Sequence, residues 1–116
     1  MTRVRRDTPA PLLGSLEEQV MLAVLRTGHE AYGMNVRREL ESVTGRDVTI
    51  GSVYTTLDRL EAKGLVASTR TPAADAASRR VFAVTAAGQR SLALTRATRE
   101  RLWTGVKLPL DAKRGS

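Results

Sequence analysis

The chain has 116 residues, which is enough for one compact domain. Its formal net charge of +7 and sequence pI of about 11.0 favour an anionic partner, nucleic acid first and an acidic membrane surface second. The absence of cysteine excludes disulfides and thiolate metal sites, and a lone histidine is a poor metal site, so no cofactor is expected. No apolar run is long enough to span a membrane, so a cytoplasmic protein is expected.

Residues 1–14 are expected to form a flexible basic arm. They contain three arginines and a close pair of prolines, which resists helix formation. Two interpretations stay open: a disordered terminus, or an arm that touches DNA.

The first helix is expected to begin near Ser15, because Ser15 and Glu18 have the spacing of a capping box. Residues 20–25 are apolar on nearly every side, which predicts a helix buried all round. Gly28 is expected to end it.

A second helix is predicted over about residues 31–43, with Gly45 as its end. Apolar residues recur there at spacings of four, four and three, which gives one stripe along a helix. The stripe consists of Tyr32, Val36, Leu40 and Val43.

The third helix has two faces of different chemistry. Thr49 is its expected N-cap and Gly64 its C′ residue. One face carries the apolar side chains of Val53, Leu57 and Leu60. The opposite face is assigned Ser52, Thr55, Thr56, Arg59 and Lys63, with Tyr54 at the flank.

Two short runs rich in valine and threonine follow, at residues 65–70 and 79–85. The eight residues between them, 71–78, contain Pro, Ala, Asp and Ser, so the pattern predicts an antiparallel hairpin with a long tip. A last helix is expected from about residue 86, after the N-cap Thr85, to Trp103.

Three helices, a hairpin and a helix is the order of a winged helix-turn-helix, so the fold is expected to be mainly α with a small β-hairpin, an α+β class. Residues 15–85 would form the DNA-binding domain, 86–103 a C-terminal dimerisation helix and 104–116 a flexible tail. The dimerisation helix has too little core of its own, which favours contact with a second chain through Leu92, Leu94, Leu102 and Trp103. Packing of Trp103 within one chain, or an effector site beside it, are the alternatives.

The polar face of the third helix is the expected DNA-reading surface, since a major groove admits one α-helix. The expected DNA-binding residues are Thr49, Gly51, Ser52, Tyr54, Thr55, Thr56, Arg59, Lys63, Arg70, Arg79 and Arg80. Each has a plainer alternative. The helix face could simply be solvated, Tyr54 could pack against the wing, and Arg79 and Arg80 could pair with Asp75 or another acid.

The chain also resembles the PadR family of transcriptional regulators over about residues 13–103. The resemblance rests on the order and spacing of "LGSLEEQVMLAVL", "AYGMNVRRELESVTG", "GSVYTTLDRLEAKGLV" and "SRRVFAVTAAG". It implies a homodimer that binds inverted-repeat double-stranded DNA, usually as a repressor and often released by a small-molecule effector. By position, it implies that Tyr54 touches phosphate and that Arg79 and Arg80 belong to a basic wing strand.

Other function classes are less favoured. A winged-helix protein–protein interaction module would lack the basic face of the third helix. An enzyme is not expected, because the chain has no cysteine, a single histidine, no glycine-rich phosphate loop and no carboxylate pair that periodicity places on one apolar pocket. Activator and RNA-binding roles are not separated from repression by the sequence.

Overall fold

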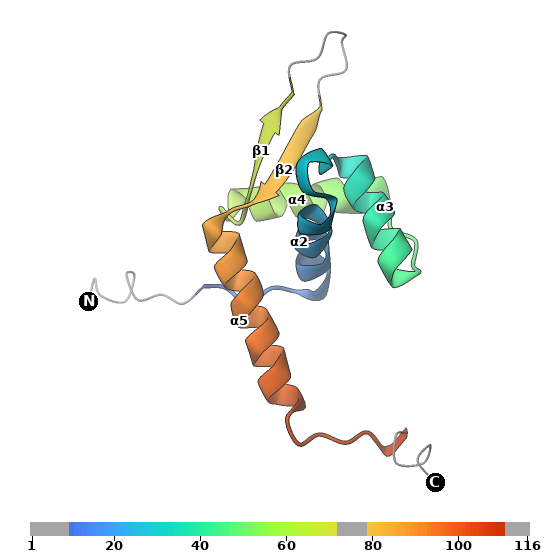
Figure 1. Ribbon diagram of the computed structural model, residues 1–116, viewed down its shortest axis with the longest axis vertical. Helices are drawn as coiled ribbons and strands as arrows, with labels where there is room; N and C mark the ends of the chain where they lie inside the picture. Colours follow the sequence, from blue (N-terminus) through green and yellow to red (C-terminus); the bar gives the residue numbers. More distant parts are fainter. Residues whose placement is uncertain (1–9, 72–78, 111–116) are drawn as a thin grey trace, which may run out of the picture.

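The computed structural model describes residues 10–71 and 79–110 and shows three helices, a two-stranded antiparallel hairpin and a long last helix (Figure 1). The elements are α2 (Ser15–Thr27), η1 (Gly28–Glu30), α3 (Gly33–Thr44), α4 (Ile50–Ala62), β1 (Val66–Arg70), β2 (Arg80–Val84) and α5 (Ala86–Trp103). This arrangement confirms the predicted winged helix-turn-helix. The first nine residues of the expected arm, the expected wing tip at 72–78 and the last six residues of the expected tail lie outside the described residues.

The start of α2 differs from the prediction. Gly14 is the N-cap, and its N–H donates to Glu17 Oε1 at 3.0 Å. The helix starts one residue earlier than the capping box required, so Glu17 rather than Glu18 occupies the third helical position. Glu18 instead forms an ion pair with Arg99 of α5 at 2.7 Å.

The expectation that α2 is buried all round is wrong. Val20, Met21 and Val24 are buried, but Leu22 is 42% and Leu25 is 48% exposed. The other elements cover only part of the circumference of α2. An apolar strip is therefore left open between α3 and α5.

A short bridge joins the helices to the hairpin. Tyr32, just before α3, bridges to Val81 of β2, and Phe82 N–H donates to Ala31 O at 3.0 Å. The helix therefore begins at Gly33, two residues later than expected. Val43, placed by its spacing on the apolar stripe, is exposed, because Gln19 and Leu22 of α2 border it without covering it.

The ends of α4 are as predicted. Thr49 Oγ1 accepts from Ser52 N–H at 3.0 Å at the start of the helix. At its end Leu65 N–H donates to Leu60 O at 2.9 Å, and Gly64 adopts the left-handed conformation with φ of 77°. This is the Schellman arrangement, which directs the chain into β1.

The core lies where α2, α3, α4 and the hairpin meet. It is built from small and medium aliphatic side chains around one aromatic residue, Phe82. The fully or nearly buried members are Val20, Met21, Ala23, Val24, Ala31, Val36, Leu40, Val53, Leu57, Leu60, Leu65, Val66, Phe82 and Leu92.

Only the first half of α5 belongs to this core. Thr85 caps the helix by accepting from Gly88 N–H at 3.0 Å, and Leu92 packs into the core of its own chain. The assignment of Leu92 to a dimer surface is therefore wrong. Beyond Thr95 the described part of α5 contains no buried residue, and Figure 1 shows it leading away from the body of the protein.

Ser91 is the weak point of this packing. Its hydroxyl oxygen is buried without a hydrogen-bond partner in the described part of the chain. Burial of an unpaired hydroxyl costs about 1–3 kcal/mol. Ser91→Ala removes that oxygen and keeps the shape, so we expect the free energy of unfolding to rise by about 1 kcal/mol in urea titrations. A decrease would mean that the hydroxyl has a partner in solution.

Candidate nucleic-acid interface

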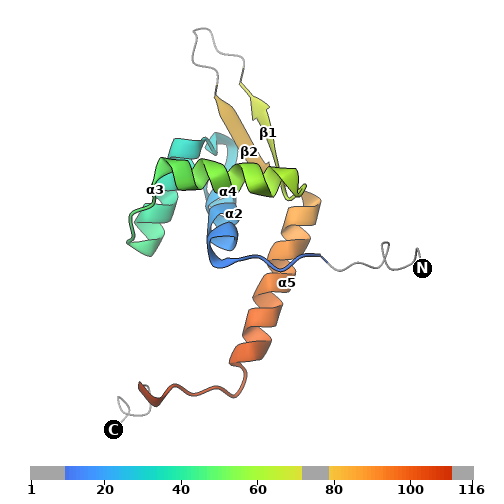
Figure 2. The same ribbon diagram turned by 180° about the vertical axis from the view of Figure 1, so that it is seen from behind.

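The outer face of α4 is the first part of the candidate interface. Ser52, Thr55 and Arg59 are exposed on it, as predicted. Figure 2 shows α4 running across the front of the molecule with no other element over it. The helix can therefore approach a flat or grooved partner along its full length.

Thr56 does not belong to this face. At about 100° per residue it lies only about 60° from Val53, the centre of the apolar side. It is 4% exposed. The prediction grouped it with its neighbour Thr55, which points about 100° away, and was wrong on its orientation.

Lys63 lies at the edge of the face and is tied to α2. Its Nζ is 2.8 Å from Glu17 Oε2. The hydrogen bond from Lys63, followed by that from Gly14 N–H, lowers the pKa of Glu17 below its usual value. Contact between Lys63 and DNA stays a prediction, and it would require this bond to open.

Arg80 joins the hairpin to α4. Its Nη2 lies 3.0 Å from Asp58 Oδ1 and 2.8 Å from Glu61 Oε1, and its guanidinium stacks 4.8 Å from the Phe82 ring centroid. Burial lowers the pKa of Arg80, but the hydrogen bonds that Arg80 donates to Asp58 and Glu61, with the attraction of their charges, outweigh this effect and the pKa is raised. Arg80 therefore pairs with two acids of α4, which is the alternative to DNA contact considered above for this residue. Asp75 lies outside the described residues.

Tyr54 packs against the hairpin, which is the alternative to phosphate contact considered above for this residue. It is half-buried, and its ring centroid is 6.5 Å from that of Phe82 in β2. The ring also lies directly against Gly33: a Cβ added there would be 2.3 Å from Tyr54 Cζ. Only glycine at position 33 leaves room for the Tyr54 ring in this position. Contact of its hydroxyl with phosphate stays a prediction.

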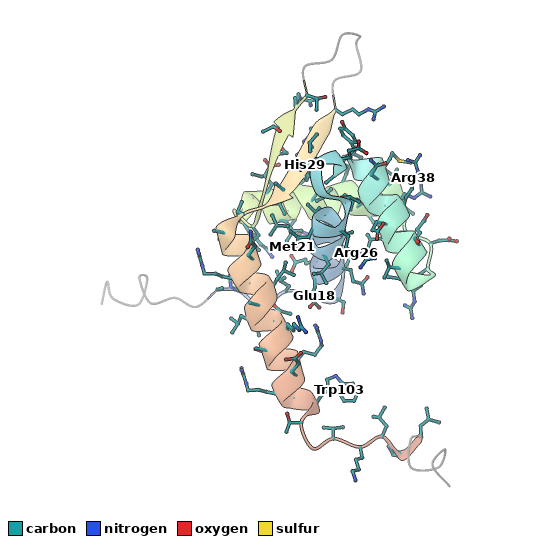
Figure 3. All side chains as sticks on the ribbon, viewed as in Figure 1. Glu18, Met21, Arg26, His29, Arg38 and Trp103 are labelled. Carbon is teal, nitrogen blue, oxygen red and sulfur yellow. The ribbon has the colours of Figure 1, made fainter. Side chains whose placement is uncertain are left out.

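A cavity of about 510 Å³ lies between the start of α3, α4 and the hairpin. Its lining is rich in arginine and tyrosine and consists of Tyr32, Met34, Asn35, Arg38, Tyr54, Arg70, Arg79 and Arg80. Four of these residues were not predicted as site residues: Tyr32, Met34, Asn35 and Arg38. No periodicity reveals them, because the cavity joins segments that are far apart in the chain. Figure 3 shows Arg38 on the outer side of α3.

Two arginines of this cavity are held by neutral groups. Arg79 lies 4.9 Å from the ring centroid of Tyr32. Arg38 Nη1 donates to Asn35 Oδ1 at 3.1 Å, and Asn35 Nδ2 donates to Glu30 O at 2.8 Å. Both guanidinium groups are thereby oriented without losing their charge.

Pairing with acids distinguishes some of the basic residues from others. The paired residues are Arg26, Arg37, Lys63, Arg80, Arg96 and Arg99. Within residues 10–71 and 79–110, no such ion pair involves Arg38, Arg59 or Arg79. Among the described residues, these three place positive charge on α3, α4 and the hairpin without an ion pair, although Arg59 lies near enough to Glu17 to help lower its pKa.

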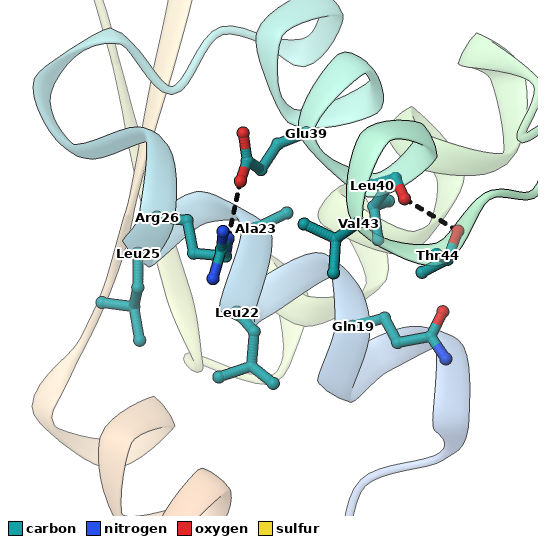
Figure 4. Close-up of a pocket in the computed structure, with 9 residues that line it drawn as sticks. All are labelled: Gln19, Leu22, Ala23, Leu25, Arg26, Glu39, Leu40, Val43 and Thr44. Atoms are coloured by element: carbon teal, nitrogen blue, oxygen red, sulfur yellow. Dashed lines mark hydrogen bonds and ion pairs between the residues drawn. The ribbon is translucent and has the colours of Figure 1, made fainter.

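A second, apolar surface lies around α2. A cavity of about 360 Å³ between α2 and α3 is lined by Leu22, Leu25 and Val43, with the Arg26–Glu39 ion pair at its edge (Figure 4). Leu22 and Leu25 also line a groove of about 440 Å³ between α2 and α5.

The predicted dimer residues divide along α5. Leu102 is 73% and Trp103 is 53% exposed, and Leu94 is half-buried. Figure 3 shows Trp103 at the far end of the helix, away from the core. The end of α5 therefore has large apolar side chains that its own chain does not cover.

The described residues were also searched for metal sites and for membrane-spanning helices. Across them, no cluster of three or more His, Cys, Asp or Glu side chains could hold a metal ion. None of the helices in this part of the chain combines the length and hydropathy that a bilayer crossing requires.

Comparison with known proteins gives one family. The family model described as "Transcriptional regulator PadR-like family" matches residues 21–94, more than half of the chain. No curated protein matches.

Solved structures give the same fold. A PadR-like transcription factor from Bacteroides fragilis has 24% identity and a TM-score of 0.66 over 75% of this chain and 82% of that one. A PadR family regulator from Eggerthella lenta has 26% identity and a TM-score of 0.62, over 78% and 82%. Bacillus subtilis PadR, solved in complex with operator DNA, has 17% identity and a TM-score of 0.56, over 81% of this chain and 49% of that one.

Proposed function

Because the chain belongs to the PadR-like family of transcriptional regulators, we propose that it is a homodimeric repressor that binds an inverted-repeat operator. The family is one of transcription regulators and not of enzymes. The observation that carries the DNA-binding part is the uncovered face of α4, on which the exposed Arg59 forms no ion pair within the described residues. The complex of Bacillus subtilis PadR with operator DNA supports a DNA partner for this fold.

The chemistry of α4 suits the major groove. Ser52 and Thr55 are small and let the helix approach closely, and Arg59 is long enough to reach a guanine edge or a phosphate. The start of α4 at Thr49 presents the positive end of the helix dipole to a phosphate. The proposed DNA contacts are Thr49, Gly51, Ser52, Tyr54, Thr55, Arg59, Lys63, Arg70, Arg79 and Arg80.

We propose that residues 15–85 form the DNA-binding unit and that α5 forms the dimer. One recognition helix reads only a few base pairs, whereas a two-fold dimer reads two half-sites about one helical turn apart. Leu102 and Trp103 offer apolar area at the end of α5, and Leu22 and Leu25 offer an open apolar strip on α2. In the proposed dimer the second chain would cover both.

Repression, with release by a small molecule, is the mode that we propose within this family. A dimer seated on an operator represses where that operator overlaps a promoter. The test is to retain fragments of the host's DNA on the purified protein at near-physiological salt and to sequence them. An enriched inverted repeat supports the proposal, and retention without any shared sequence contradicts it.

Arg59→Ala should weaken binding to the enriched repeat by about 1–3 kcal/mol if Arg59 reads a base. The loss should be smaller on a random duplex, because base contacts carry the sequence preference. Fluorescence anisotropy with both duplexes measures it. Arg90→Ala is the matched control, because Arg90 is exposed on α5, outside the proposed interface. Unchanged affinity for the repeat would show that this face of α4 does not read DNA.

A further inference from the structure

We infer that the cavity between α3, α4 and the hairpin is a seat for one phosphate group of the DNA backbone, clamped by Arg38 and Arg79. The inference rests on the proposed function and adds a residue of α3 to the interface. Arg38 is not among the residues that the sequence predicted to bind DNA, and the folded chain brings it to the hairpin.

Charge is the first argument. Arg79 is held by the face of Tyr32 and Arg38 by the amide oxygen of Asn35, and neither forms an ion pair within the described residues. Six other basic residues in the described ranges lie within ion-pair distance of an acid. Two oriented, uncompensated guanidinium groups on one cavity attract an anion with several acceptor oxygens.

The shape of the cavity is the second argument. It opens beside the hairpin and is about 510 Å³ in volume, with contributions from three elements. Gly33 leaves room for Tyr54 to lie against α3, which makes the tyrosine part of the wall. A phenolic hydroxyl is a common donor to phosphate oxygens.

The position of the cavity is the third argument. Tyr54 is on α4 and shares the wall with Arg79 of the hairpin, so the cavity adjoins the proposed reading helix. A phosphate held there would fix the register of α4 in the groove without reading sequence. Arg38 and Arg79 are therefore assigned to positioning, and Arg59 to reading.

The test compares Arg38→Gln and Arg79→Gln with Arg90→Gln in the full chain. Arg90 also has no ion-pair partner within the described residues, so each variant removes one uncompensated charge. Fluorescence anisotropy gives the affinity for the enriched repeat and for a random duplex between about 50 and 200 mM salt.

Arg38→Gln and Arg79→Gln should each reduce the slope of log affinity against log salt by about 0.9, and weaken binding about eightfold near 0.1 M salt. The loss should be equal on both duplexes, and Arg90→Gln should leave the slope unchanged. An unchanged slope for Arg38→Gln, while Arg59→Ala still weakens the repeat, overturns the phosphate seat and leaves the proposed function standing. Wild-type protein that binds neither duplex overturns both.

Inorganic phosphate separates the DNA backbone from a free anion. Thermal unfolding is followed in phosphate and in chloride of equal ionic strength. Stabilisation of the wild type but not of Arg38→Gln, together with unchanged DNA slopes, would assign the cavity to a free phosphate group and overturn the backbone assignment.

Discussion

Replacing Gly88 with alanine should lower the free energy of unfolding by about 3 kcal/mol, the upper part of the range for overpacked cores. A Cβ at position 88 would lie 2.1 Å from Leu65 O, 2.8 Å from Val84 Cγ1 and 2.9 Å from Met21 Cε. The first contact is with backbone, and Leu65 O is held in place because it accepts from Thr85 N–H at 3.1 Å. The methyl group can be accommodated only if α5 moves away from the hairpin.

Urea and thermal unfolding, at one fixed protein concentration, measure this loss. The melting temperature should fall by more than about 10 °C. Gly51→Ala is the matched control, because an added Cβ there has no atom within 4 Å and the position is helical. It should leave stability unchanged or raise it by up to about 1 kcal/mol. Equal stability of Gly88→Ala and the wild type would show that the contact of α5 with Leu65 is loose in solution.

The ends of α4 and the start of α5 were predicted well because local sequence patterns mark them. The cap at Thr49, the turn at Gly64 and the cap at Thr85 each depend on side chains and backbone within a few residues. The residues that make such hydrogen bonds are close in the sequence, so the pattern can be recognised there. The bounds of α4 and α5 were therefore accessible from the sequence alone.

Burial around α2 was not accessible in the same way. Leu22 and Leu25 are as apolar as Val20 and Val24, and nothing in their spacing distinguishes them. Their exposure depends on which sides of α2 the other elements cover. A sequence pattern shows that a side chain is apolar but not which neighbour covers it, and a second chain is one such neighbour.

The cavity beside the hairpin shows the same limit. Arg38 follows Arg37 in the sequence, yet Arg37 pairs with Glu41 and donates to Val48 O at 2.8 Å, whereas Arg38 reaches the cavity. Adjacent arginines point in different directions on a helix. Only the packing of the hairpin against α3 decides which of them faces the proposed interface.

Replacing both Leu102 and Trp103 with glutamate should convert the proposed dimer into monomers. Both side chains are exposed at the end of α5, where the described part of the chain leaves them uncovered. A large aromatic anchor is the type of residue that carries interface energy, and burying two new carboxylates there would be costly. Light scattering should report the mass of one chain, and the unfolding curve of the core should change little, because neither residue belongs to it.

The monomer should bind the inverted repeat at least about a hundredfold more weakly, since linked binding of two half-sites is lost. Binding to a single half-site should stay the same, because α4 is untouched. Val43→Glu is the control: Val43 is 57% exposed and apolar, but lies on α3, away from the end of α5. A dimer that survives the double change would move the interface from the end of α5 to the strip on α2. Dissociation by Val43→Glu as well would extend the interface into the groove between α2 and α3, because that groove and the strip share Leu22 and Leu25.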